Sequence, residues 1–80
     1  MLVTVNKPIF AESASKLVNL ASGFSETILL KKDHWVVDAK SLLGVLALSL
    51  QPGDQLEIDV QGGNEAAVKQ SFLDTELFQG

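Results

Sequence analysis

Along this chain the apolar residues recur every two residues in some segments and every three or four residues in others. This succession of two periods limits the possible folds more than any other feature of the sequence. Residues 2–6 alternate apolar and polar, as a half-buried strand does. From Ala11 to Ala21 the apolar residues recur at helical spacing, and Gly23 then stands where a left-handed C-cap is expected. The chain therefore begins with a strand followed by an amphipathic helix.

The remaining segments extend this pattern. Residues 24–30 and 34–38 have strand propensity and are joined by a polar turn, which predicts a hairpin. Three more elements follow: a short helix over 42–48 with Ser41 as N-cap, a strand over 55–60, and a helix over 65–78 that Asn64 can cap. The predicted order is β-α-β-β-α-β-α.

This order predicts a single domain over residues 1–80 with an α+β fold. We expect an open-faced two-layer β-sandwich, in which three helices cover one face of a four-stranded sheet. The chain has 80 residues and no cysteine. A core of this size is small and no disulfide can support it, so its stability has to come from close packing.

The polar composition excludes several kinds of site. The chain has six basic residues, all lysine, ten acidic residues and a single histidine, His34. A thiol nucleophile, a cysteine zinc site, an arginine clamp on phosphate and a cage of several histidines each need residues that this chain lacks. We predict no enzymatic activity, no metal site and no cofactor.

Charge and hydropathy indicate the partners and the cellular location to be expected for this chain. The net charge is −4 and the only adjacent basic pair is Lys31-Lys32, so nucleic acid is not an expected partner. The longest apolar stretch, residues 42–50, is about half of the roughly 20 residues that span a bilayer. No basic segment with a long apolar run marks the start as a signal peptide. We expect a cytoplasmic protein that does not insert into membranes.

Individual polar residues do not form a recognisable site. His34 lies in the predicted hairpin turn, where a solvated histidine is the ordinary case. Glu57 and Asp59 share one face of a strand, which is typical of a solvated sheet face. Gly62-Gly63 lacks the lysine and hydroxyl residue of a phosphate-binding loop. These patterns indicate ordinary surface and turn positions.

The segment 42–48 is unusual because it is apolar on every side of a short helix. Such a helix is either fully buried or presents an apolar face to another molecule. Leu42, Leu43 and Leu46 could therefore form a docking patch or cover one end of the core. The periodicity alone leaves both interpretations open.

The block Asp38-Ala39-Lys40-Ser41-Leu42-Leu43-Gly44-Val45-Leu46-Ala47-Leu48 resembles the Asn-Ala-Lys-Ser-Ile-Met-Gly-Val-Met-Ser-Leu block of the HPr family. These are the small phosphocarrier proteins of the bacterial sugar phosphotransferase system. The order of elements over residues 2–77 fits the same family. The resemblance implies that protein partners dock where Leu42, Leu43 and Leu46 lie.

The family's phosphate-carrying motif is of the type Gly-Leu-His-Ala-Arg-Pro-Ala, at the start of the first helix. Placed on residues 8–14, it puts Phe10 at the histidine and Glu12 at the arginine. A phenyl ring cannot accept a phosphoryl group, and a carboxylate repels phosphate. The resemblance thus implies a divergent member that does not carry phosphate on histidine, in which Phe10 adds an aromatic side chain to the docking surface.

Ser41 matches the family's regulatory serine, which a kinase phosphorylates in many Gram-positive bacteria. The family variant Crh likewise lacks the active histidine and keeps this serine, although it also keeps the arginine. Ser41 is accordingly a candidate phosphorylation site, while a plain N-cap role also explains a serine there. Two further alternatives stay open: a working phosphocarrier with a wrongly placed motif, and an interaction domain unrelated to sugar uptake.

Overall fold

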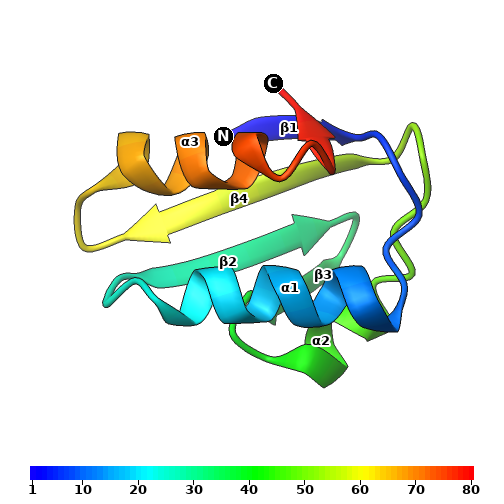
Figure 1. Ribbon diagram of the computed structural model, residues 1–80, viewed down its shortest axis with the longest axis horizontal. Helices are drawn as coiled ribbons and strands as arrows, with labels where there is room; N and C mark the ends of the chain where they lie inside the picture. The colour runs from blue at the N-terminus through cyan, green and yellow to red at the C-terminus, as the bar shows by residue number, and fades with distance from the viewer.

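The computed structural model describes residues 1–80 and has an α+β architecture, as predicted (Figure 1). The strands are β1 (Leu2–Val5), β2 (Thr27–Lys32), β3 (Trp35–Asp38), β4 (Gln55–Gln61) and β5 (Phe78–Gln79). The helices are α1 (Ala11–Ser22), α2 (Leu42–Ala47) and α3 (Glu65–Asp74). Figure 1 shows α1 and α3 together on one side of the sheet, which confirms the open-faced two-layer arrangement.

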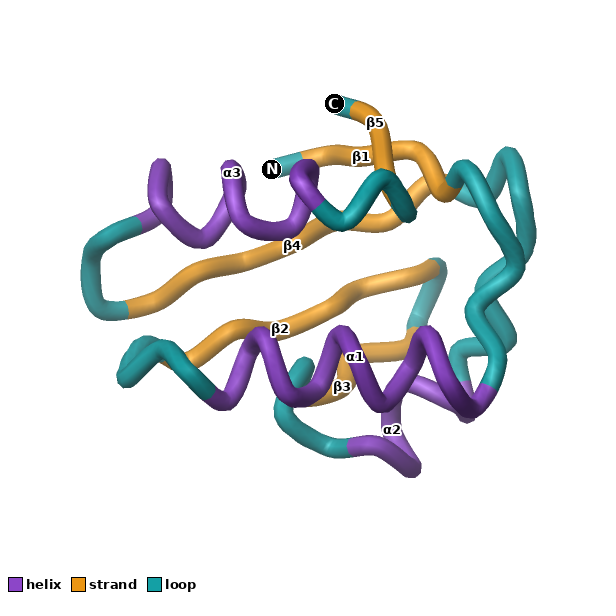
Figure 2. Tube along the Cα trace, viewed as in Figure 1, coloured by secondary structure: helices purple, strands orange, loops and turns teal.

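The five strands form one antiparallel sheet in the order β3-β2-β4-β1-β5. Its longest pairing joins β2 to β4, from Thr27 opposite Gln61 to Lys31 opposite Glu57. Figure 2 shows β3 at the end of the sheet that is remote from β1 and β5. The two outer strands are therefore β3 and β5.

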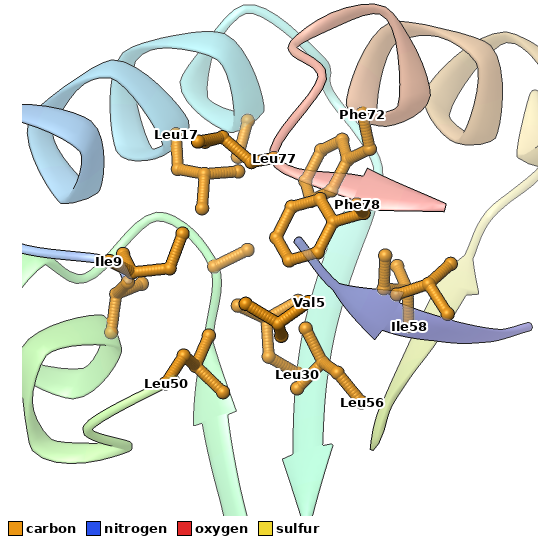
Figure 3. Close-up of a cluster of buried hydrophobic side chains, with 14 of the residues drawn as sticks. Val5, Ile9, Leu17, Leu30, Leu50, Leu56, Ile58, Phe72, Leu77 and Phe78 are labelled. Carbon is orange, nitrogen blue, oxygen red and sulfur yellow. The ribbon is translucent and has the colours of Figure 1, made fainter. Parts of the chain in front are cut away.

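The core lies between the sheet and the helices (Figure 3). Leu56 and Ile58 of β4 are fully buried while Glu57 between them is exposed, as the alternation predicts. The stripe of α1 is buried as well, at Ala14, Leu17 and Ala21. Burial of such a stripe against a sheet is the main source of helix stability in a small domain.

The predicted four-stranded sheet is wrong by one strand, because the last helix ends at Asp74 and not at residue 78. Glu76 has a φ of 64°, which reverses the chain, and Phe78 then pairs with Val5 in β5. The ring of Phe78 stacks on Phe72 of α3, with 6.2 Å between centroids. Leu77 and Phe78 are buried here, and apolar residues at these positions also fit a longer amphipathic helix, so the apolar pattern could not distinguish the two.

Two other predicted details need correction. Gly23 is not left-handed: its φ is −74°, and its N–H continues the helical turn by donating to the Leu20 oxygen at 3.2 Å. The following residues, 24–26, form a bend, so β2 begins at residue 27. Asn64 is the N-cap residue of α3, but its side chain accepts no hydrogen bond from the helix and instead donates to the buried Glu26 carboxylate at 3.0 Å.

Asp54 joins three segments next to the end of α2. Its carboxylate accepts a hydrogen bond from the Gln51 N–H at 2.8 Å and lies 3.0 Å from the Lys32 Nζ. Lys32 also donates to the Leu48 carbonyl at 3.1 Å. The hydrogen bond from Gln51, followed by the contact with Lys32, holds the pKa of Asp54 below its ordinary value of 3.8.

Asp54→Asn should therefore weaken the acid dependence of stability. A lowered pKa in the folded state stabilises the protein at pH values above 3.8, and this contribution disappears as the pH falls through the folded pKa. We expect the variant to be less stable than the wild type at pH 7 and to converge with it in acid. Urea unfolding between pH 7 and pH 2 measures this difference, and parallel pH profiles would contradict the assignment.

Candidate functional site

The N-terminus of α1 begins at Phe10, whose backbone is extended with φ −105° and ψ −171°. Ser13 closes this end of the helix, because its Oγ accepts from the Phe10 N–H at 3.0 Å. The phenyl ring of Phe10 cannot cap the helix, and 65% of the residue is exposed. Glu12 in the first turn is also exposed, where its charge suits the positive end of the helix dipole.

An open hollow of about 470 Å³ lies beside this helix end. It is formed by the first half of α1, the segment before it and the turn after α3. Its lining residues are Lys7, Phe10, Glu12, Ser13, Lys16, Thr75 and Leu77. The hollow brings together two lysines and one glutamate around the exposed phenyl ring.

Ser41 caps α2 as predicted, with its Oγ accepting from the Gly44 N–H at 3.2 Å. Gly44 allows α2 to approach β3 closely, since a Cβ there would lie 3.1 Å from the Cβ of Val37. Ser41 itself remains exposed. The helix thus packs through its Gly44 side and leaves its capping hydroxyl at the surface.

The three leucines of α2 are in different environments. Leu43 is the most exposed large apolar residue, with 81% of its surface accessible, and Leu42 is also exposed. Leu46 is half-buried and packs against the core. The residues of this segment that are buried in the core are Val45 and, after the helix, Leu48 and Leu50. The helix therefore packs on the core through Leu46 and Val45 and leaves Leu42 and Leu43 exposed.

Helices α1 and α2 are in contact, and the Ile9 N–H just before α1 donates to the Leu50 carbonyl at 3.1 Å. Figure 1 shows α2 beside the N-terminal half of α1. The exposed Phe10 at the start of α1 and the exposed leucines of α2 therefore belong to adjoining elements.

The other polar candidates occupy surface positions. His34 is exposed in the turn between β2 and β3 and does not line the hollow. Glu57 and Asp59 both lie near Lys31, at 3.8 and 3.3 Å from its Nζ. The hydrogen bond from Gln61, and then the one from Lys31, lower the pKa of Asp59. These acids form a surface ion-pair network, and no cluster of three or more potential metal ligands is present.

The sequence did not reveal the hollow. Lys7 and Lys16 flank the α1 terminus in sequence, but Thr75 and Leu77 come from the opposite end of the chain. Their approach depends on the turn after α3 and on the Asn6 N–H, which donates to the Leu77 carbonyl at 2.7 Å. No local pattern in the sequence encodes this contact.

Comparison with known proteins agrees with this architecture. The sequence model described as "PTS HPr component phosphorylation site" matches residues 2–75. The phosphocarrier protein HPr of Treponema pallidum is 39% identical over 71 residues, which cover 89% of this chain and 78% of the relative. The HPr-like protein Crh of Bacillus subtilis is 33% identical over 55 residues, covering 69% and 65% respectively.

A solved structure of the histidine-containing phosphocarrier protein from Mycoplasma superimposes with a TM-score of 0.85. It is 28% identical, and the match covers 100% of this chain and 98% of that one. An open antiparallel sheet with three helices on one face is thus the HPr type of α+β fold. The chain belongs to the HPr family of phosphocarrier proteins of the sugar phosphotransferase system. None of its helices has the length and apolar character needed to cross a bilayer.

Proposed function

We propose that this protein is a divergent HPr-family member that does not carry a phosphoryl group on histidine and acts through contact with other proteins. The observation that supports this most directly is the exposed Phe10 at the N-cap of α1, the position we assign to the family's histidine. The only histidine, His34, is in the β2–β3 turn. The proposal excludes catalysis and requires no cofactor.

The chemistry of the helix end supports the proposal. The first-turn amides of a helix and its dipole favour a phosphate, and an arginine there would add a charge-assisted hydrogen bond. Here the side chain that we assign to the arginine position is the carboxylate of Glu12, which repels phosphate. The helix end thus lacks both the group that accepts the phosphoryl and the charge that stabilises it.

The direct test incubates the wild-type protein with phosphoenolpyruvate and enzyme I of the phosphotransferase system. We expect no acid-labile phosphate on the protein, measured by intact mass before and after acid treatment. An HPr of known activity serves as the positive control in the same reaction. Stoichiometric acid-labile phosphate would instead support the alternative of a working phosphocarrier.

The proposed docking surface consists of Phe10, Leu42, Leu43 and Leu46. Its support is the exposure of Phe10 and Leu43 on two helices that contact each other. Large exposed apolar side chains on one side of a small protein are typical of protein interaction sites. Leu46 is the half-buried member of this set and also packs on the core.

Leu43→Glu should abolish binding of a docking partner while leaving the fold intact. Removing an apolar anchor at the centre of an interface costs about 2 kcal/mol or more, or about 30-fold in affinity. Leu43 is 81% exposed, so unfolding in urea should change by less than about 0.5 kcal/mol. Affinity capture from a lysate of the native host, with quantitative mass spectrometry, measures the loss.

Leu2→Glu provides the matched control, because Leu2 is 60% exposed on β1 and lies outside the proposed surface. Proteins captured by the wild type and by the Leu2 variant, but not by the Leu43 variant, are the docking partners. If the Leu43 variant retained every captured protein, the docking surface on α2 would be wrong.

Regulation at Ser41 is a second part of the proposal, supported by the exposure of this residue at the start of α2. A phosphate would sit at a helix N-terminus, which is favourable. Glu12 on the contacting helix would oppose it if the two groups approach each other. Treatment with an HPr serine kinase, followed by intact mass measurement of wild type and Ser41→Ala, decides between phosphorylation and a plain N-cap role.

A further inference from the structure

Strand β3 is an outer strand of the sheet, and two of its three exposed residues, Trp35 and Val36, are apolar. Trp35 and Val36 are 61% and 57% exposed, although both lie in a regular strand. Outer strands usually carry a lysine, a proline or a bulge that prevents pairing with another chain. The sequence Trp35-Val36-Val37-Asp38 has no lysine, proline or bulge, and its one charged residue, Asp38, stands at the end of the strand.

The hydrogen-bond pattern of the β2–β3 ladder defines which main-chain groups are free. The Ala39 N–H donates to the Ile28 carbonyl at 2.9 Å, in the same register that pairs Leu30 with Val37. Because bonded and non-bonded pairs alternate in an antiparallel ladder, Trp35 and Val37 direct their main-chain groups towards β2. Val36 and Asp38 direct theirs to the open edge.

At Asp38 the edge is partly occupied. Its carbonyl accepts from the Ser41 N–H at 2.9 Å, and its carboxylate accepts from the Lys40 N–H at 2.9 Å. The N–H of Asp38 remains available, as do both main-chain groups of Val36. Any strand added here must therefore form its hydrogen bonds around Val36.

A second copy of the same strand meets this requirement in one antiparallel register. When the two Val36 residues lie opposite each other, they exchange two main-chain hydrogen bonds across a two-fold axis. Trp35 of each copy then faces Val37 of the other, on the helix side of the sheet. Aromatic and β-branched pairs of this kind are among the stabilising cross-strand pairs.

The same register is complementary in polarity. Asp38 of one copy lies opposite His34 of the other, the turn residue directly before β3, so the imidazole can donate to the carboxylate. Shifting the pairing by two residues in either direction removes this pair and places Val36 opposite Asp38 or His34. Only in the register centred on Val36 does every apolar residue of β3 lie opposite an apolar residue while Asp38 lies opposite His34.

We propose that this protein forms a symmetric dimer through edge-to-edge pairing of β3, centred on Val36, which joins the two sheets into one. The inference does not depend on the proposed function, since β3 carries none of the docking residues. Main-chain hydrogen bonds from an added strand supply affinity, and the alternate side chains supply register, as in other strand-addition interfaces.

Two substitutions test the dimer without disturbing the monomer. Val36→Glu places two carboxylates opposite each other at the two-fold axis, whereas in the monomer it faces Lys31 across the ladder. Val36→Pro removes the outward N–H, which β2 does not use, and proline is tolerated at such edge positions. Should the proline variant fail to fold, the glutamate variant alone carries the test.

Sedimentation velocity over a concentration series should show wild type changing from 8.6 kDa to twice that mass, and amide exchange at Val36 and Asp38 should slow in parallel. Both Val36 variants should dimerise at least about tenfold more weakly, equivalent to 1.4 kcal/mol. Leu2→Lys is the control: it removes an exposed apolar side chain from β1 and should leave the dimer intact.

Three results would overturn the proposal. The first is a wild-type monomer throughout the series. The second is a dimer that both Val36 variants retain, which would indicate an exchanged segment or another face. The third is dimerisation with rapid amide exchange at Val36.

Discussion

The double substitution Phe10→His and Glu12→Arg should convert the protein into an acceptor of phosphate from phosphoenolpyruvate and enzyme I. The backbone at position 10 is already the extended N-cap of α1, so an imidazole there would stand at the positive end of the helix. Lys7 and Lys16 line the adjoining hollow and add positive charge. We expect acid-labile phosphate on the double variant and none on the wild type.

The single variant Phe10→His supplies the phosphate acceptor but keeps Glu12, so it measures the electrostatic effect of position 12 by itself. It should be phosphorylated about tenfold or more slowly than the double variant, because Glu12 repels the incoming phosphate while an arginine would contribute a charge-assisted hydrogen bond of about 1.5–3 kcal/mol. Initial rates from intact mass spectrometry measure this ratio. Equal rates for the two variants would show that position 12 does not face the phosphate.

Phe72→Ala should cause the largest loss of stability among single substitutions. Phe72 is fully buried and stacks on Phe78, so its truncation leaves a cavity between α3 and β5 (Figure 3). Truncation of a buried phenylalanine costs about 3–5 kcal/mol. A chain of 80 residues has a total stability of about 4–12 kcal/mol at the usual value per residue.

Thermal unfolding monitored by circular dichroism should therefore show a decrease in Tm of about 12 °C or more. Phe10→Ala is the matched control, since it deletes the same side chain from a position that is 65% exposed. Its unfolding free energy should change by less than about 0.5 kcal/mol. Similar losses for the two variants would contradict the assignment of Phe72 to the core.

Local sequence patterns predicted most of the fold because they reflect burial within single elements. The alternation at Leu56 and Ile58 and the helical spacing of Ala14 and Leu17 correspond to buried faces. The error in the number of strands occurs where a buried residue fits two structures. The apolar Phe78 fits either a continued helix α3 or a strand, and only its pairing with Val5 distinguishes the two.

The candidate site was predicted less completely than the fold. Ser41 could be identified as an N-cap from its position before an apolar run, and the structure places its Oγ on the Gly44 N–H. The different exposures of Leu43 and Leu46 could not be predicted, because a helix that is apolar all round gives no indication of its buried side. The contact between Gly44 and Val37 decides which side that is.

The sequence by itself determined the order of the helices and the first four strands, the resemblance to the HPr family and the absence of any histidine before His34. These properties depend on residue identity and on spacing within short segments. Only the tertiary structure decided the fifth strand, the hollow at the start of α1 and the open edge at Val36. Each of these depends on contacts between segments distant in sequence, and residue spacing carries no information about which distant segments meet.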